Sequence, residues 1–274
     1  MKSAPNSKAN LDRAILRYAQ SDVRAVSLRV SMANTIVAQM IGQGVVKGGS
    51  GLKFRYGEAA TRVTIDLDTA WNTNLDAFLK DLNEKLKTGW NGFDGLLVVQ
   101  RQASPRGIPF DYVMQPCDVK LNYKGTPWFT VKLEIGHNEI GDADEIDLIP
   151  PRKDVSDLFD FLCLPTPGAI PVMRLEFQIA QKLHGASAPN SKRAHDLIDL
   201  QLVLAHATLD WLKMADICRR LFAYRKVHAW PPTITKGESW DEVYAAQAVG
   251  LSVLPTVDEA ITWANELIAK IDAS

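Results

Sequence analysis

The chain of 274 residues has few cysteines, and they stand far apart. Cys117, Cys163 and Cys218 form no Cys-x-x-Cys pair, so their spacing offers neither a zinc knuckle nor a disulfide framework. The sequence also lacks the run of about eighteen apolar residues that a membrane-spanning helix requires. Near the N-terminus there is no continuous apolar stretch of the signal-peptide kind. These absences predict a protein that is neither secreted nor membrane-bound, in a reducing, cytoplasmic location.

A strong net charge is missing too, because 31 Lys and Arg residues stand against 32 Asp and Glu residues. No global field draws such a chain onto nucleic acid, so any nucleic-acid surface must be a local patch. The N-terminal region offers one, with Lys8, Arg13, Arg17, Arg24 and Arg29 against Asp12 and Asp22. A solvated helix surface explains the same pattern.

Hydrophobic periodicity predicts a helical first segment, a strand-rich middle and a helical second half. The expected helices of the first half cover residues 9–41 and 74–87, the second capped by Asn74. The expected strands cover residues 62–68, 95–101, 116–123 and 128–135, with a turn over 125–127. The expected later helices cover about 174–186, 192–208, 210–226, 239–249 and 257–272.

Several predicted strands follow one another without an intervening helix, which favours an α+β fold with a mixed or antiparallel sheet over a doubly wound one. The acidic segment 142–158 is interrupted by prolines and marks a shift in composition. We therefore expect an α/β lobe over residues 1–165 and a mainly helical lobe over residues 166–274 that completes the cleft.

Two carboxylates, Asp66 and Asp68, fall on one face of the predicted strand because side chains alternate with period two. Mg²⁺ takes one or two such carboxylates together with phosphate oxygens and water. Upstream, the segment Lys47-Gly48-Gly49-Ser50 can present N–H groups and a hydroxyl to phosphate. A solvated strand face and a plain loop are the ordinary explanations. Together the two segments predict a phosphate cradle facing a metal site, although the Walker A pattern is absent.

Two further residues could join that chemistry. Glu134 lies on the predicted strand 128–135, where it could be a third metal ligand or a base. An ion pair with Lys132 on an exposed strand face explains it equally well. Lys182 lies beside the apolar face of the helix 174–186 and could reach a triphosphate as a point charge. A surface lysine with a buried stem is the alternative.

The next helix carries Asp196 and Asp199 three residues apart, on one side, with Arg193 three residues before Asp196. A charge network on a helix surface accounts for this group as well as a functional role does. His195, His184 and His137 have no spacing that marks them as metal ligands.

Four segments in order resemble the AbiEii/AbiGii toxin family of nucleotidyltransferases, which includes the mycobacterial MenT toxins. They lie within residues 47–200 and are KGGSGLKFRYG (47–57), RVTIDLD (62–68), LEI (133–135), and LEFQIAQKLHG (175–185) with RAHDLIDL (193–200). One departure is His195, which stands where the family commonly has arginine or lysine.

The resemblance implies a bilobed enzyme of the DNA polymerase β-like superfamily. Such enzymes transfer a nucleoside monophosphate from an NTP bound with Mg²⁺, or alternatively Mn²⁺, to a hydroxyl and release pyrophosphate. Family members are toxins of toxin–antitoxin or abortive-infection systems, and some add nucleotides to the 3′ end of tRNA. The implied partners are an NTP, an RNA with tRNA favoured, and a winged-helix antitoxin.

Matching positions give the residues their implied roles. Phosphates would be held by Lys47, Gly48, Gly49 and Ser50, the metal by Asp66, Asp68 and Glu134, and triphosphate charge would be neutralised by Arg62 and Lys182. Asp196 would orient Lys182 or assist the hydroxyl. Replacing Asp66 or Lys182 by alanine is expected to abolish activity without unfolding. A kinase, a protein NMP-transferase and a degenerate nucleotide-binding module remain open alternatives.

Overall fold

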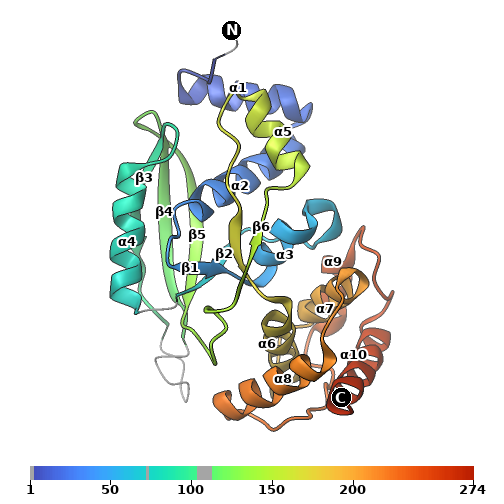
Figure 1. Cartoon of the computed structure of the whole chain (residues 1–274). Coiled ribbons are helices and arrows are strands. Elements are labelled where there is room, and N and C mark those ends of the chain that lie inside the picture. Colours follow the sequence, from blue (N-terminus) through green and yellow to red (C-terminus); the bar gives the residue numbers. More distant parts are fainter. Residues whose placement is uncertain (1–2, 72–73, 104–112) are drawn as a thin grey trace. The chain divides into compact units, whose positions relative to one another are not determined.

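The computed structural model describes residues 3–71, 74–103 and 113–274 (Figure 1). The chain forms two compact units, each assembled from segments that are distant in the sequence. Unit 1 comprises Met1–Arg55, Ile65–Asn138 and Ile146–Val172, and unit 2 comprises Tyr56–Thr64, Glu139–Glu145 and Met173–Ser274. The predicted division into lobes 1–165 and 166–274 stays a prediction.

Unit 1 is built on a seven-stranded sheet with the order β3-β4-β5-β2-β1-β7-β6. The strands are β1 (Gly44–Val46), β2 (Leu67–Trp71), β3 (Phe93–Val99), β4 (Gln115–Tyr123), β5 (Thr126–Gly136), β6 (Ile146–Ile149) and β7 (Ile170–Met173). Strand β2 runs parallel to β5 and antiparallel to β1, whereas β3, β4 and β5 are antiparallel neighbours. This mixture of directions confirms the predicted fold class.

Five helices belong to the same unit: α1 (Lys8–Ala19), α2 (Asp22–Ala38), α3 (Gly48–Tyr56), α4 (Leu75–Thr88) and α5 (Lys153–Phe161). The segment 9–41 is helical as predicted, but it forms two helices, because Gln20 takes a left-handed φ of 63° and Ser21 caps a new helix. The Ser21 side chain accepts from the backbone N–H of Arg24 at 3.3 Å. Helix α4 begins as predicted, since the Asn74 side chain accepts from Ala77 N–H at 2.8 Å.

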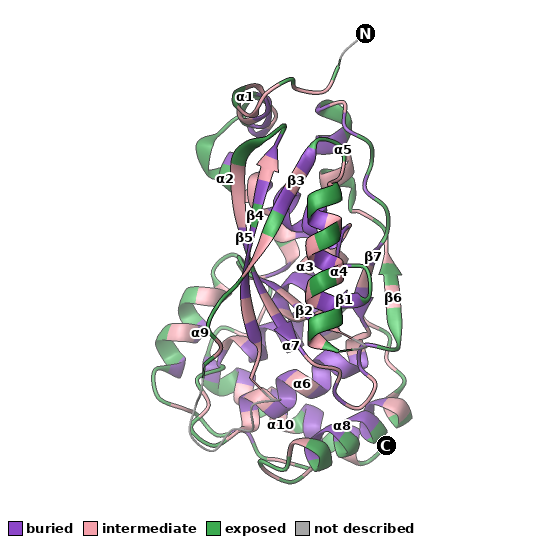
Figure 2. Cartoon of the chain, turned by 90° about the vertical axis from the view of Figure 1, so that its left-hand side faces the viewer, coloured by how far each residue is buried: buried purple, intermediate pink, exposed green. Residues whose placement is uncertain are grey.

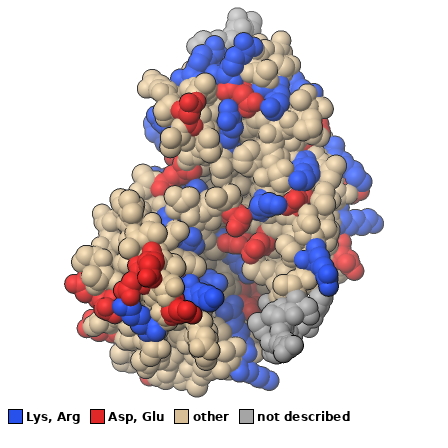
Figure 3. All heavy atoms as spheres, turned by 180° about the vertical axis from the view of Figure 1, so that it is seen from behind, with Lys and Arg blue, Asp and Glu red and all other residues tan. Residues whose placement is uncertain are grey.

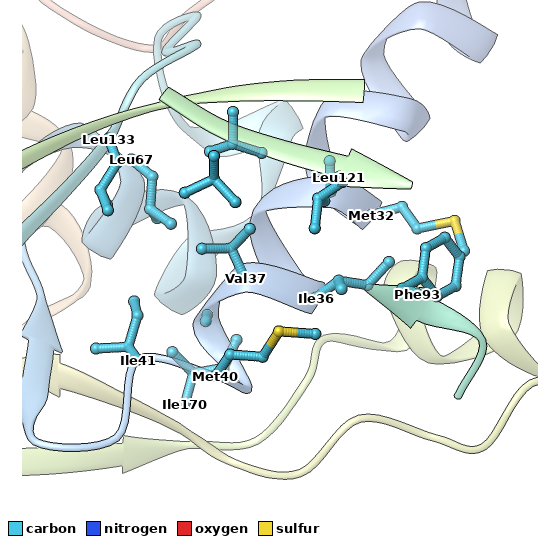
Figure 4. Close-up of a cluster of buried hydrophobic side chains, with 14 of the residues drawn as sticks. Met32, Ile36, Val37, Met40, Ile41, Leu67, Phe93, Leu121, Leu133 and Ile170 are labelled. Atoms are coloured by element: carbon cyan, nitrogen blue, oxygen red, sulfur yellow. The ribbon is translucent and has the colours of Figure 1, made fainter. Parts of the chain in front are cut away.

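One face of the sheet packs on α2 and forms the core of unit 1. Figure 4 shows Val37 of α2 close to Leu67 of β2 and Leu133 of β5. All three side chains are buried, and burying a leucine stabilises a fold by about 1.5–3 kcal/mol. Because strand side chains alternate, the neighbours of these leucines, Asp68 and Glu134, project from the other face of the sheet. Core packing therefore decides where the carboxylates point.

Most predicted strands are confirmed, with ends shifted by up to two residues, and one is wrong. The strand expected over 62–68 begins at Leu67, and residues 62–66 belong to no strand. The acidic segment 142–158 contains β6 and the first turns of α5, and the chain passes from unit 2 to unit 1 between Glu145 and Ile146. The hairpin turn is formed by Lys124 and Gly125, so β5 already includes Thr126.

Unit 2 is helical, and its five long helices confirm the helices predicted for the second half. They are α6 (Leu175–Ser187), α7 (His195–His206), α8 (Trp211–Arg225), α9 (Trp240–Ala248) and α10 (Val257–Asp272), and a short 3-10 turn covers Glu58–Ala60. Helices α8, α9 and α10 each have a buried side and an exposed side, whereas α6 has no exposed residue and α7 is exposed only at its C-terminal end (Figure 2). Within the described ranges, no helix is long and apolar enough to cross a bilayer.

Candidate functional site

The segment Lys47–Ser50 forms the junction between β1 and the first turn of α3. The backbone N–H of Lys47 donates to the carbonyl of Asp68 at 2.9 Å. Gly48 has a φ of +61°, and a Cβ on it would overlap Oδ2 of Asp68. The plain loop that was the ordinary explanation is therefore wrong, since these residues begin a helix. A helix N-terminus presents N–H groups that can bind an anion, and phosphate binding here stays a prediction.

Ser50 and Gly49 are buried in that turn. The Ser50 hydroxyl donates to the backbone carbonyl of Asp66, which ties the start of α3 to the segment before β2. The ammonium of Lys47 lies 2.6 Å from the position that a Cβ on Gly136 would take. A cation is thus held at the end of β5, two residues beyond Glu134.

Asp68 on β2 stands directly opposite Glu134 on β5 in the parallel register. Register partners on adjacent strands project to the same face, so the two carboxylates are neighbours. Asp66 is placed differently, because it lies exposed at a bend before β2 begins. The prediction that Asp66 and Asp68 share a strand face is therefore wrong. Glu134, which the sequence placed on a separate strand, is the structural neighbour of Asp68.

The donors present fit a Mg²⁺ ion that arrives with a triphosphate. Within the described part of the chain, no three His, Cys, Asp or Glu side chains converge closely enough to hold a metal by themselves. Asp68 and Glu134 supply two hard carboxylates, which is the number Mg²⁺ usually takes when phosphates and water complete its shell. The Asp68 carboxylate also fills the space over Gly48, beside the helix start. Participation of Asp66 stays a prediction.

Lys132, the possible ion-pair partner of Glu134, contacts Asp118 on the neighbouring strand β4. Lys132 donates from Nζ to Oδ1 of Asp118 on β4 at 2.7 Å, and Lys120 lies 3.3 Å from the other oxygen. The hydrogen bond from Lys132 lowers the pKa of Asp118 and outweighs the opposite effect of desolvation. The pattern Lys132-x-Glu134 therefore reflects a cross-strand pair to Asp118.

In unit 2, Lys182 of α6 lies between two buried carboxylates of α7. Its Nζ donates to Asp196 Oδ1 at 3.0 Å and to Asp199 Oδ2 at 2.6 Å. Lys182 is 4% exposed, Asp196 0% and Asp199 1%. The two ordinary explanations, a surface lysine with a buried stem and a charge network on a helix surface, are therefore wrong for these residues. A buried ion pair is retained only with good geometry and compensating partners.

Arginines complete the charge balance of this cluster. Arg62 donates through Nε to both oxygens of Asp199, at 3.0 and 3.1 Å. Arg193 donates through Nε to Asp196, and its side chain crosses α6 where Gly185 leaves no Cβ in the way. Three cations thus surround two buried carboxylates. In the described part of the chain the contacts of Arg62 use Nε, so its Nη groups remain for an anion such as phosphate.

Electrostatics keep this cluster ionised. Burial by itself lowers the pKa of Lys182, but the carboxylates of Asp196 and Asp199 outweigh it and raise the pKa above 10.5. Burial by itself raises the pKa of Asp196, yet Lys182 and Arg193 hold that pKa well below its usual value. The zero exposure of Asp196 favours the predicted orienting role over contact with a hydroxyl.

Two features of unit 2 were missed from the sequence. Asp199 accepts from both Lys182 and Arg62, and the spacing Asp-x-x-Asp was its only signal. A second buried cluster joins Glu139, Arg225 and His184: Arg225 Nε donates to Glu139 Oε1 at 2.9 Å, and Arg225 Nη1 lies 3.2 Å from His184 Nδ1. Burial, with a smaller contribution from Arg225, lowers the pKa of His184 to about 3. No local pattern connects these three positions.

The predicted site residues thus fall into two groups, each compact within its own unit. Unit 1 brings together the start of α3, Asp68 and Glu134, with Lys47 at the end of β5. Unit 2 brings together Arg62, Lys182 and Asp196, with Asp199 added by the structure.

Three solved structures are similar to the chain over most of its length. MenT4, a nucleotidyltransferase toxin from Mycobacterium tuberculosis H37Rv, has a TM-score of 0.51 at 16% identity, covering 97% of this chain and 98% of that one. JHP933 from Helicobacter pylori has a TM-score of 0.46 at 17% identity, with 92% and 93% covered. An antigenic nucleotidyltransferase-like protein from Paracoccidioides brasiliensis has 0.43 at 14%, with 72% and 88% covered. MenT4 shows the shared fold.

No curated protein matches the sequence significantly. A family profile does match, and its description is "Nucleotidyl transferase AbiEii toxin, Type IV TA system". The match covers residues 39–263 and so includes both groups of site residues. The chain therefore belongs to the AbiEii nucleotidyl transferase toxin family and is a nucleotidyltransferase of a toxin–antitoxin system.

Proposed function

We propose that this toxin uses Mg²⁺ to transfer a nucleoside monophosphate from an NTP to the 3′ end of an RNA, with tRNA as the favoured acceptor. The observation that carries the proposal is the in-register pair Asp68 and Glu134 beside the glycine-rich start of α3. Two neighbouring carboxylates next to a phosphate-binding helix start are what a metal-bound triphosphate requires.

Each residue of unit 1 has a part in this reaction. The N–H groups at Gly48 and Gly49 would receive the β- and γ-phosphates, with Lys47 as a nearby cation. Asp68 and Glu134 would hold Mg²⁺, which when bound lowers the pKa of an attacking hydroxyl and neutralises the leaving phosphates. Ser50 contributes by holding Asp66 through its hydrogen bond.

Unit 2 would supply positive charge for the triphosphate. Arg62 has Nη groups left for a phosphate, and Asp199 fixes its orientation through Nε. Lys182 is held by two carboxylates, so in this role it acts mainly by keeping Asp196 and Asp199 ionised and fixed. Catalysis of this kind depends on positioning and on stabilising charge.

The chemical step balances without another reactant. The 3′ oxygen of the acceptor forms a bond to the α-phosphorus as the bond from that phosphorus to the β-phosphate oxygen breaks. Pyrophosphate leaves, and the hydroxyl proton passes to Glu134 or to water. Family membership also implies an antitoxin partner, for which we propose a winged-helix protein.

The test is transfer of label from each α-³²P-NTP to total tRNA in the presence of Mg²⁺. Asp68→Asn is the test variant, since it keeps the shape of the side chain and removes the charge opposite Glu134. Asp94→Asn on β3 is the matched control, because Asp94 accepts a hydrogen bond from Asn122 on the same sheet. Label on tRNA that disappears only in Asp68→Asn supports the proposal and names the nucleotide.

Other results separate the alternatives. Label on protein rather than on RNA would overturn the choice of acceptor, and transfer of label from γ-³²P-NTP would indicate a kinase. Thermal unfolding in the presence of Mg²⁺ and each NTP tests binding, because a ligand that binds the native state raises its melting temperature. An unchanged melting temperature with every NTP would contradict the assigned phosphate site.

A further inference from the structure

A hollow of about 760 Å³ lies in unit 1 beside α1 and the end of α5. Its lining includes Asn10, Arg13 and Arg17 of α1, and Phe161 and Cys163 at the end of α5. Helix α1 precedes residues 39–263, the part of the chain that matches the family. The hollow is therefore an addition to the site described above.

Arg13 and Arg17 give this hollow a positive charge that the described residues leave without a neutralising acid. Both are exposed, and Arg13 makes a hydrogen bond to the uncharged side chain of Asn10. The adjacent acid, Asp12, is engaged by Lys8 at 3.4 Å and by Arg29 at 3.2 Å. Two like charges four residues apart on a helix repel each other. An anion bound between the two charges would relieve this repulsion.

The surroundings fit a polyanion. Figure 3 shows Lys and Arg side chains gathered around the end of unit 1 that carries the N-terminus. Pockets of about 300–1,000 Å³ are of the size that holds one nucleotide-sized group. Arginine binds phosphate through two parallel N–H groups, and most protein contacts to nucleic acids go to the phosphate backbone.

Helix α1 is fixed to the strand that carries Glu134. Trp128 of β5 donates from Nε1 to Asp12 at 3.1 Å, and the Tyr123 hydroxyl donates to the carbonyl of Pro5. Trp128 and Glu134 are six positions apart on β5, which at about 3.3 Å per residue is roughly 20 Å. The contact of β5 with helix α1 and the position of Glu134 therefore lie well apart along the same strand.

We propose that the hollow lined by Arg13 and Arg17 binds backbone phosphates of the RNA acceptor, away from its reacting 3′ end. The inference rests on the proposed function, in which that end lies at Asp68 and Glu134. Contacts to backbone phosphates recognise the charge and shape of the RNA and do not depend on its base sequence. They would favour an acceptor with a helical stem next to its 3′ end.

The test compares the full-length protein with the double variant Arg13→Gln/Arg17→Gln, in which the similar helix propensity of glutamine preserves α1. The matched control is Lys87→Gln/Lys153→Gln. It removes the same charge from exposed ion pairs of unit 1 with Glu84 and Asp157. Binding of total tRNA is measured at several salt concentrations, together with kcat, KM for tRNA and KM for the NTP.

The expected result is weaker tRNA binding in the double variant and a salt slope reduced by about 1.4 to 1.8, since each lost phosphate contact removes about 0.7 to 0.9. KM for tRNA should rise, while kcat and KM for the NTP should equal those of the control.

Equal slopes in the double variant and the control would overturn the inference and leave the proposed function intact. A wild type that binds tRNA through these arginines but transfers nothing to it would overturn the function alone. Binding restricted to free mononucleotides, or to an acidic protein, would overturn the choice of RNA.

Discussion

Replacing Lys182 by methionine keeps an unbranched side chain up to the position of Cε and removes the charge from between Asp196 and Asp199. In the wild type, Nζ lies 3.0 and 2.6 Å from those carboxylates, and all three residues are almost completely buried. Removing one partner of a buried ion pair costs about 3–5 kcal/mol, because it leaves charge without compensation. Arg62 and Arg193 still contact the carboxylates in the variant, so we expect the lower end, about 3 kcal/mol.

The pH dependence gives the prediction a second signature. Lys182 has a raised pKa, so its contribution is complete below its usual value of 10.5 and is lost as the pH rises through the folded value. Asp196 has a lowered pKa, so its contribution is complete above its usual value of 3.8 and is lost as the pH falls through the folded value. The difference between wild type and variant should therefore be largest between about pH 4 and pH 10.

The free energy of unfolding is measured by urea denaturation, and hydrogen exchange at α6 and α7 reports the same loss locally. A loss of about 3 kcal/mol corresponds to a fall in melting temperature of about 6 to 12 °C. Lys213→Met is the control, because Lys213 pairs with Glu145 at 2.6 Å on the surface and such pairs contribute less than about 1 kcal/mol. A Lys182→Met protein within about 1 kcal/mol of the wild type would refute the reasoning. The expected loss of about 3 kcal/mol would also revise the expectation, made from the sequence, that Lys182→Ala leaves folding intact.

Three further predictions concern the other described features. Gly48→Ala is expected to cost more than about 1 kcal/mol and to weaken binding of Mg²⁺-NTP, because φ is +61° and the Cβ overlaps Asp68; normal thermal stabilisation by NTP would contradict this. Asp68→Asn should lower kcat by about 10²-fold or more with a melting temperature close to that of the wild type, and a fully active variant would remove Asp68 from the site. Stability should fall as the pH drops below 6.5, by at most about 1.4 kcal/mol per pH unit, because the pKa of His184 is about 3 in the folded chain and the unfolded chain takes up the proton first. His184→Gln should flatten that slope, as urea titrations at several pH values would show.

Local patterns were sufficient to predict the regular elements in which one physical cause dominates. Helix α4 follows from the Asn74 cap and an apolar stripe, and β4 follows from alternation. The strand expected over 62–68 does not form over residues 62–66, because a contact with a residue distant in the sequence determines the conformation of this segment. Val63 and Ile65 are β-branched, yet they are 77% and 61% exposed and belong to no strand. Arg62 pairs with Asp199 in unit 2, so tertiary contacts override the local preference.

The features of the candidate site also divide into those that local spacing predicts and those that depend on tertiary contacts. The spacing of Asp196 and Asp199 predicts a shared helix side, but spacing is the same for a surface network and for a buried one. The register that places Asp68 beside Glu134 depends on the parallel pairing of strands about 65 residues apart, which no local pattern contains. The sequence, with the family resemblance, identified the charged groups and the pairing of Lys182 with Asp196, whereas the contacts of Asp199 and the register of Asp68 with Glu134 came only from the tertiary structure.

Arg62 and Asp199 are 137 residues apart in the chain. A ribosome adds about 5 to 20 residues per second, so Arg62 is made about 7 to 27 seconds before the carboxylate that binds it. During that interval the growing chain contains every residue of the phosphate cradle but lacks the charges that fix Arg62 and Lys182. A ribosome that stops before α7 releases a fragment without this network, so the buried charge cluster forms only after α7 has been made.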